Sequence, residues 1–239
     1  MKKIILVSVL SGLLFISCGV SNKSIIRQQK MEEGVSNPTT IEDLKDAISK
    51  YQERVADIQL ANSQIGIWYK IVGTKYLDNK MYGEALKSFE KALEYYPDNQ
   101  NLYYYVGVCA GYMSHAALDF GGTGSNTEKM NYLRLAEESY IRAISIEDTY
   151  VRALYGLGVL YVFELDESDK AIPYLEKLLT IDKKHIDAMF VLARAYYSTF
   201  DFDKSIAMYD KIIENSKSEE VLTNAQNNKK IVLDAAYSN

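Results

Sequence analysis

One spacing of small and large residues recurs between about residues 66 and 219 of the 239-residue chain. In its first copy, Tyr69, Gly73 and Tyr76 are followed nine residues later by Ala85, and then by Phe89 at helical spacing. Residues three and four apart share one face of an α-helix, so each copy describes two helices whose small residues lie where they touch. Only three prolines and 13 glycines interrupt the chain, which favours long helices. The sequence therefore predicts an all-α protein built from stacked helix pairs.

Three further copies follow the first. Their repeat positions are Tyr103, Val106, Gly107, Ala110, Ala136, Tyr140 and Ala143 in the second, Leu154, Leu157, Gly158, Tyr161, Ala171, Leu175 and Leu178 in the third, and Met189, Leu192, Ala193, Tyr196, Ser205, Tyr209 and Ile212 in the fourth. The second copy has 17 extra residues between its helices and the third has one, counted against the nine-residue spacing of the first. Because they recur at positions that take large side chains, we expect seven tyrosines to pack in the core: Tyr69, Tyr76, Tyr103, Tyr140, Tyr161, Tyr196 and Tyr209.

The first copy resembles the tetratricopeptide repeat, through Ala85-Leu-Lys-Ser-Phe89-Glu-Lys-Ala92 and the helix-ending Pro97. The resemblance implies a right-handed superhelical solenoid of about four helix-turn-helix units within a domain spanning residues 39–238. The expected units are 66–99, 100–150 with an insertion at 111–127, 151–185 and 186–219. We expect an extra helix before them and a capping helix at 219–236, interrupted at Asn227 and Asn228.

The N-terminal segment predicts export. Met1-Lys2-Lys3 is positively charged, and the apolar run from Ile4 to Ile16 is too short for the roughly 20 residues that cross a bilayer. The following Phe15-Ile16-Ser17-Cys18-Gly19 resembles the lipobox of bacterial lipoproteins, which implies a signal peptide at 1–17 and acylation of Cys18. An ordinary cleaved signal and an uncleaved signal anchor are the alternatives.

Residues 18–38 lack a helical or strand period and are expected to form a flexible tether. Thr39 and Glu42 have the spacing of a helix capping box. Apolar residues then recur at three and four positions from Ile41 to Ile58, which predicts one amphipathic helix. Trp68 is expected to pack against that preceding helix.

Composition excludes several classes of function. The chain has 27 basic and 32 acidic residues, a net charge of -5, which disfavours nucleic acid as a partner. Its two cysteines, Cys18 and Cys109, exclude a disulfide framework or a zinc cage, and Cys109 is expected to be buried. His115 and Asp119 lie four residues apart but have no third ligand, so we expect no metal.

No catalytic set can be assembled from the sequence, so we expect no enzyme activity and no cofactor. The glycine-rich stretch 121–124 follows no predicted strand and lacks the ending of a phosphate-binding loop. We expect one helix from Leu102 to Phe120 and a second beginning with a capping box of Ser125 and Glu128, which together form a projecting hairpin.

The resemblance places binding on the concave face, which the first helix of each pair lines. Counting inward positions predicts ten groove residues: Lys70, Thr74, Tyr104, Val108, Arg152, Tyr155, Val159, Phe190, Arg194 and Tyr197. Aromatic and cationic side chains dominate this set although the protein is acidic, which favours an extended peptide or an anionic ligand. The competing explanations are tyrosines that only close the helix pairs and arginines held in structural ion pairs. Thr74 and Tyr105 stand where the family's clamp for C-terminal carboxylates has Asn, which argues against a chaperone-tail clamp.

The combined hypothesis is a membrane-tethered scaffold that binds a peptide or protein partner in its groove. The alternatives are a ligand-capturing lipoprotein beside a periplasmic transporter and a subunit of an outer-membrane assembly complex. The expected location is the bacterial cell envelope, lipid-anchored at the outer membrane and facing the periplasm, because Gly19 stands where some inner-membrane lipoproteins have Asp. The oligomeric state is left open.

Overall fold

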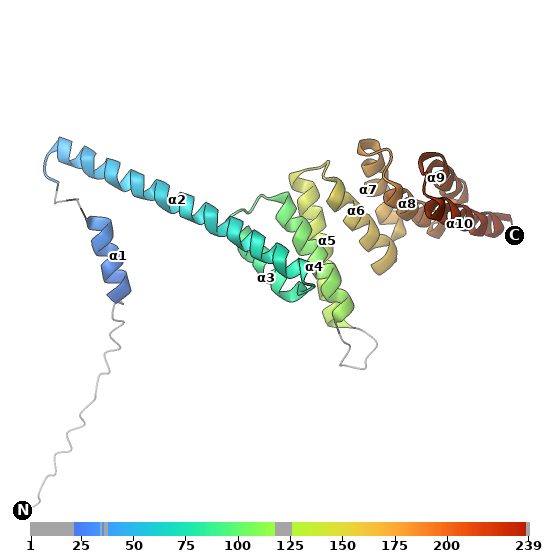
Figure 1. Cartoon of the computed structure of the whole chain (residues 1–239), viewed down its shortest axis with the longest axis horizontal. Coiled ribbons are helices and arrows are strands. Elements are labelled where there is room, and N and C mark those ends of the chain that lie inside the picture. Colours follow the sequence, from blue (N-terminus) through green and yellow to red (C-terminus); the bar gives the residue numbers. More distant parts are fainter. Residues whose placement is uncertain (1–21, 34, 36–37, 118–125, 238–239) are drawn as a thin grey trace, which may run out of the picture. The chain divides into compact units, whose positions relative to one another are not determined.

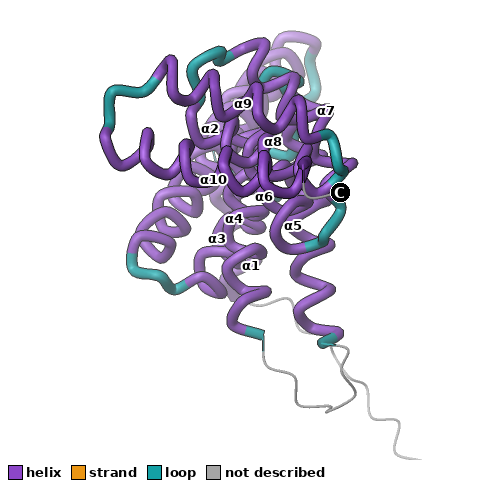
Figure 2. The backbone as a smooth tube through the Cα atoms, turned by 90° about the vertical axis from the view of Figure 1, so that its right-hand side faces the viewer, coloured by secondary structure: helices purple, strands orange, loops and turns teal. Residues whose placement is uncertain are grey.

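The computed structural model of the chain describes residues 22–33, 35, 38–117 and 126–237. Every regular element within these ranges is helical (Figures 1 and 2). The elements are α1 (Asn22–Glu32), α2 (Ile41–Asp78), α3 (Tyr82–Leu93), α4 (Gln100–Ala116), α5 (Thr127–Ile146), α6 (Val151–Val159), the π-helical turn η1 (Leu160–Glu164), α7 (Ser168–Ile181), α8 (Ile186–Ser198), α9 (Phe202–Asn215) and α10 (Glu219–Tyr237). The all-α prediction is confirmed.

The chain divides into two compact units, residues 1–60 and residues 61–239. The first unit holds α1 and the beginning of α2. Helix α1 lies within the segment 18–38 that we expected to be a tether without regular structure, so that expectation differs from the structure over Asn22–Glu32. Its Lys, Arg and Gln residues have high intrinsic helix propensity, which the search for an apolar period did not register.

Helix α2 begins at a capping box one residue later than predicted. The Asp43 N–H donates to Thr40 Oγ1 at 3.1 Å, and the Thr40 N–H donates to Asp43 Oδ2 at 3.2 Å. This reciprocal pair satisfies two donors at the helix N-terminus. Asp43 therefore takes the role that the sequence assigned to Glu42. A hydrogen bond to Thr40 lowers the pKa of the Asp43 carboxyl.

The helix then runs to Asp78 without a break, although we expected an extra helix followed by a separate first repeat helix. No proline separates the two segments, and the isolated Asn62, Ser63 and Gly66 are tolerated within a long helix. A consequence is that Trp68 has no preceding helix to pack against. Its side chain is 61% exposed, which corrects the expected packing.

In the second unit, consecutive helices from α3 to α10 pack against each other in chain order (Figure 1). The buried residues form two hydrophobic clusters. One joins α3 to α4, and the other extends from α4 to α10. Tyr140, Tyr161, Tyr196 and Tyr209 are buried as predicted, while the other three expected core tyrosines are half-buried.

Glycines lie at the helix contacts that the repeat spacing indicates. A Cβ atom on Gly73 would approach the Phe89 ring to 2.8 Å, and one on Gly158 would approach Leu175 to 2.5 Å. Real Cβ atoms do not come this close, so a side chain at either position would force the helix pair apart. The interpretation of these glycines as close-contact positions is confirmed.

The insertion in the second repeat is described only at its two ends. Helix α4 ends at Ala116 and not at Phe120, and the second helix begins at Asn126, whose Oδ1 accepts from the Lys129 N–H at 2.9 Å. Asn126 is therefore the N-cap in place of the predicted Ser125, since its amide oxygen is well placed for the cap. The glycine-rich stretch 121–124 and Asp119 lie outside the described residues.

The extra residue in the third repeat is accommodated by η1. A π-helical turn holds one more residue than an α-helical turn, so the helix absorbs the insertion without a loop. At the other end of the array, α10 buries Ala225 and Val232 against α9 and runs continuously through Asn227 and Asn228. The predicted interruption there is wrong, because an exposed Asn is tolerated in a helix that tertiary packing already holds.

Candidate binding groove

Five of the ten predicted groove residues meet in one pocket of about 290 Å³ in the second unit. Its complete lining is Tyr104, Val108, Gly111, Tyr112 and His115 of α4, Tyr140 of α5, and Arg152, Tyr155, Gly156 and Val159 of α6. The first helices of two successive repeats therefore form its walls, as the resemblance implied. The pocket combines aromatic rings with one permanent cation.

Tyr140 reaches this pocket because two glycines make room for its ring. A Cβ atom on Gly107 would lie 2.7 Å from the ring, and one on Gly156 would lie 2.8 Å from it. The α5 side chain therefore inserts between α4 and α6. Tyr140 is only 6% exposed, which confirms its predicted place in the core and adds a role in the pocket wall.

Tyr104 lies at the centre of a cluster of aromatic rings. Its centroid is 5.4 Å from that of Tyr105, 6.2 Å from that of Tyr140 and 5.9 Å from that of Tyr150. Burial raises the pKa of the Tyr104 hydroxyl, and the positive charge of Arg152 opposes that rise. The hydroxyl is accordingly neutral near pH 7 and can donate or accept a hydrogen bond.

Arg152 supplies the cation at the pocket. Its guanidinium carbon lies 5.9 Å from the centroid of Tyr104, within reach of a cation–π interaction. The side chain is exposed, and its polar neighbours are the hydroxyls of Tyr105 and Tyr150. A structural ion pair is the competing explanation for this arginine. Among the described residues, no carboxylate forms an ion pair with it. The positive charge therefore remains available to an anionic acceptor.

The sequence reasoning missed Tyr112 and His115, which extend the pocket along α4. The Tyr112 ring stacks on Tyr82 with centroids 4.3 Å apart, and His115 Nε2 lies 3.3 Å from Glu164 Oε1. Both residues continue the helical face of Tyr104 and Val108 at four- and seven-residue steps, so the same count carried one turn further would have found them.

The other five predicted groove residues do not join this pocket. The Thr74 hydroxyl donates to the Lys70 carbonyl of its own helix at 2.9 Å. Phe190 packs edge-on against Tyr209, with centroids 6.1 Å apart. Arg194 and Tyr197 line a separate depression of about 50 Å³. Among the described residues, the structure thus divides the predicted continuous groove into distinct parts, of which the α4–α6 pocket has the larger volume.

The described residues were expected to contain neither a metal site nor a reactive thiol. Among them, no group of three or more His, Cys, Asp or Glu side chains is placed to hold a metal ion. Cys109 is fully buried, as predicted, and burial raises the pKa of its thiol to about 12. Among the described residues, no helix is both long enough and apolar enough to span a membrane. Cys18 lies outside the described residues.

Comparison with known proteins agrees with this architecture. Tetratricopeptide-repeat models match residues 67–99 and 162–226. A TPR repeat-containing protein of Borreliella burgdorferi is 27% identical over 212 residues, covering 87% of this chain and 90% of that protein. A thermophilic TPR protein of Thermus thermophilus superposes with a TM-score of 0.55 at 18% identity, covering 81% of this chain and 92% of its own.

A second solved structure, YrrB, is described as a TPR protein with an unusual peptide-binding site. It superposes with a TM-score of 0.54 at 22% identity, covering 78% of this chain and 85% of its own. The fold and its repeated helix pairs thus place this chain among the helical-repeat solenoids. The tetratricopeptide repeats that the family models find at 67–99 and 162–226 agree with the spacing of the first copy.

Proposed function

We propose that this protein is a membrane-tethered TPR module that binds an extended segment of a protein partner across the α4–α6 pocket. The TPR fold itself supports protein or peptide binding. In the proposed complex, an apolar or aromatic side chain of the partner enters between Tyr104, Val108 and Val159, and a neighbouring carboxylate or carbonyl oxygen accepts from Arg152.

The observation that carries this proposal is an exposed cation beside a pocket of aromatic rings. Aromatic and arginine side chains dominate binding energy at protein interfaces, because they combine apolar area with directed hydrogen bonds. The pocket volume of about 290 Å³ is at the lower limit of the roughly 300–1,000 Å³ typical of small-molecule sites. One or two partner side chains fill such a pocket better than an enclosed transported ligand does, which favours the peptide-binding role for this pocket.

The membrane part of the proposal rests on the sequence of residues 1–19. A positively charged start, a short apolar run and Cys18 in a lipobox-like context support export and acylation. The acyl chains would anchor the protein to the bacterial envelope and leave the repeat array free to bind its partner. We place the anchor in the outer membrane, on its periplasmic side, because Gly19 follows Cys18. This binding role needs no catalytic group.

The test uses peptides selected from a random displayed library against the full chain. Affinity of a selected peptide is measured by fluorescence anisotropy for the wild type, for Arg152→Ala and for the control Arg142→Ala. Arg142 is an exposed arginine of α5 that pairs with Asp98 at 3.1 Å, away from the pocket. We expect Arg152→Ala to weaken binding by about 1.5–3 kcal/mol, the value of a hydrogen bond to a charged group, with an unchanged melting temperature.

The control variant Arg142→Ala should leave affinity within twofold of the wild type. Failure to select any peptide, or equal losses in the two variants, would contradict the assignment of the pocket. A lowered melting temperature for Arg152→Ala would instead assign that arginine a structural role.

A further inference from the structure

The N-terminal part of α2 carries a stripe of exposed apolar side chains. Its members are Ile41, Leu44, Ile48, Tyr51, Val55 and Ile58, each between 37% and 68% exposed. Leu44, Ile48, Tyr51 and Val55 also line a shallow apolar depression of about 410 Å³ on the surface of this helix. No described residue of the first unit covers this stripe, which we call the α2 seam.

The spacing of the seam points to another helix as its partner. The members follow each other at alternating steps of three and four residues, a strict period of 3.5. In a helix that packs on a globular core, the apolar residues recur with a period of 3.6 residues. A period of 3.5 residues over several helical turns instead predicts a left-handed supercoil of two or more helices. Ile41, Ile48 and Val55 then occupy the first core position of successive heptads. β-Branched residues at that position favour two-stranded coils where Leu occupies the second core position, as Leu44 does in the first heptad.

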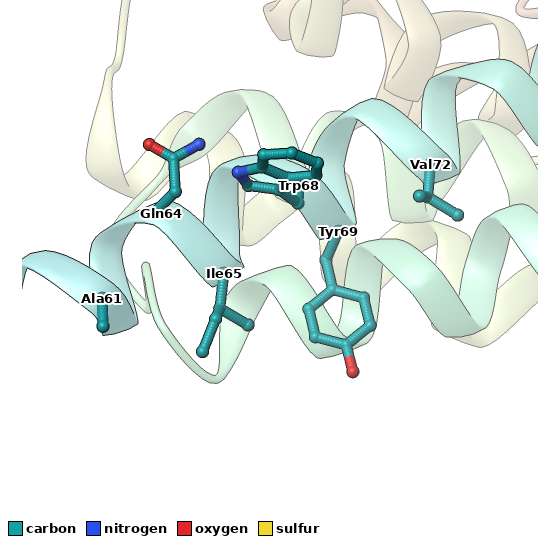
Figure 3. A pocket seen from close by; sticks show the side chains of 6 residues that line it. All are labelled: Ala61, Gln64, Ile65, Trp68, Tyr69 and Val72. Carbon is teal, nitrogen blue, oxygen red and sulfur yellow. The ribbon is translucent and has the colours of Figure 1, made fainter.

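One heptad further along the sequence, the same core position is Asn62, and the next core residue is Ile65. Figure 3 shows Ile65 at the surface of α2, where it is 40% exposed. A single Asn in an otherwise apolar series of core positions pairs with its equivalent in a parallel, in-register dimer. An antiparallel or shifted arrangement would bury this amide against an apolar side chain, at the cost of an unpaired polar group.

The area available agrees with a stable dimer. The seven apolar core residues from Ile41 to Ile65 are on average about half exposed. If a fully exposed side chain of this kind has roughly 175 Å² of accessible surface, together they present on the order of 600 Å² per chain. Stems of the flanking residues add to this, so the total approaches the approximately 800 Å² per partner of a standard interface. Most helical stability in proteins comes from tertiary packing of an amphipathic face, and a second copy would supply that packing to the seam.

Charge argues against a lipid surface as the occupant of the seam. Residues 41–58 contain five acidic and three basic side chains. Helices that lie in anionic membrane interfaces are instead rich in Lys and Arg on their polar face. The heptad positions beside the core face each other across a parallel pair of helices. Ala47 of one copy would face Gln52 of the other, and Arg54 would face Gln59, so no like charges meet there.

We propose that two copies of this chain associate through a parallel, in-register, two-stranded coiled coil formed by the α2 seam. The seam shares no residue with the α4–α6 pocket. The dimer would present two pockets to one partner or to two. This proposal does not depend on the peptide-binding role, and each can fail without the other.

The first experiment measures the mass of the full chain by light scattering over a range of concentrations. The wild type should be a dimer, and Ile48→Glu with Val55→Glu should weaken dimerisation on the order of 100-fold or more, because two charges enter the core of the coil. The matched control, Ser49→Glu with Ala56→Glu, adds the same charge at the same spacing one residue along and should remain a dimer. Circular dichroism checks that both variants are folded.

The second experiment tests the orientation by disulfide formation in a Cys18→Ser background, with the buried Cys109 retained. Leu44→Cys should form a covalent dimer under mild oxidation, since a parallel in-register coil brings the two positions together. Ser49→Cys, on the outer side, should cross-link at least tenfold less. A monomeric wild type, a dimer that survives the two seam glutamates, or the absence of cross-linking at Leu44→Cys would overturn the proposal. A monomer that binds anionic phosphatidylglycerol vesicles would assign the seam to a lipid surface instead.

Discussion

At the scale of single residues, glycine determines how closely the helices of this protein approach. Gly107 and Gly156 leave room for the Tyr140 ring between α4 and α6, and Gly73 leaves room for the Phe89 ring between the two helices of the first repeat. Gly111 is different, because a Cβ atom there would meet nothing within 4 Å. The same residue type therefore has opposite consequences for stability at different positions of one fold.

This contrast gives a paired prediction. Gly73→Ala should destabilise the protein by about 1–3 kcal/mol, because the fully buried Phe89 ring cannot move away from the added methyl group. Gly111→Ala should stabilise it by roughly 0.5–1 kcal/mol, since it lowers the backbone entropy cost of helix formation without a clash. Urea unfolding of both variants measures the difference. A Gly73→Ala protein as stable as the wild type would contradict the repeat register.

At the scale of elements, the turn η1 shows how the array tolerates an inserted residue. Leu160, Tyr161 and Val162 of this turn are buried, while Phe163, which follows them, is 57% exposed. The backbone takes up the insertion locally as a π-helical turn, so the core positions before and after it keep their register. Because π-helical turns are intrinsically less favourable than α-helical ones, their retention depends on the surrounding packing.

Deletion of Phe163 tests this interpretation of η1. Removal of one residue should convert the turn to a regular α-helical one and retain the fold, with a thermal midpoint within a few degrees of the wild type. The matched control is deletion of Arg194, an exposed residue of the regular helix α8. That deletion rotates the following residues by about 100° and should destabilise the protein strongly. Circular dichroism measures the thermal midpoint of each variant. An equal decrease of the midpoint in the two deletions would show that η1 is not the site of the insertion.

At the scale of the whole molecule, the proposed anchor and the folded array are separate modules. The proposed lipidation would take place at Cys18, whereas the described core begins with residues of the first repeat. The second cysteine, Cys109, is buried and its thiol has a raised pKa, so it is a poor substrate for modification in the folded chain.

We therefore expect Cys18→Ser to move the protein from the membrane to the soluble fraction while its helicity and melting temperature stay unchanged. Cys109→Ala, which alters the other cysteine, should leave the membrane fraction unchanged and lower the melting temperature. Fractionation of cells followed by immunoblotting measures the distribution. Unchanged membrane association of Cys18→Ser would contradict the lipobox interpretation.

The repeat architecture could be predicted from the amino-acid sequence alone, because each helix pair is encoded within one window of residues. Small residues at the contact positions, such as Gly73 and Ala85, and a helical apolar period are local features that need no knowledge of distant segments. The core role of Tyr140 and the burial of Cys109 followed from the same count.

Which groove residues act together depended on the assembled fold. The pocket arises because Tyr140 of one helix inserts between two glycines on two others, and the side chains of two successive repeats set that geometry. Local periodicity places Tyr104 and Arg194 on equivalent faces, but the rotation from one helix pair to the next depends on packing between repeats. The inclusion of Tyr140 in the pocket wall likewise depended on tertiary packing, whereas Tyr112 and His115 lie on the helical face that local periodicity already defines.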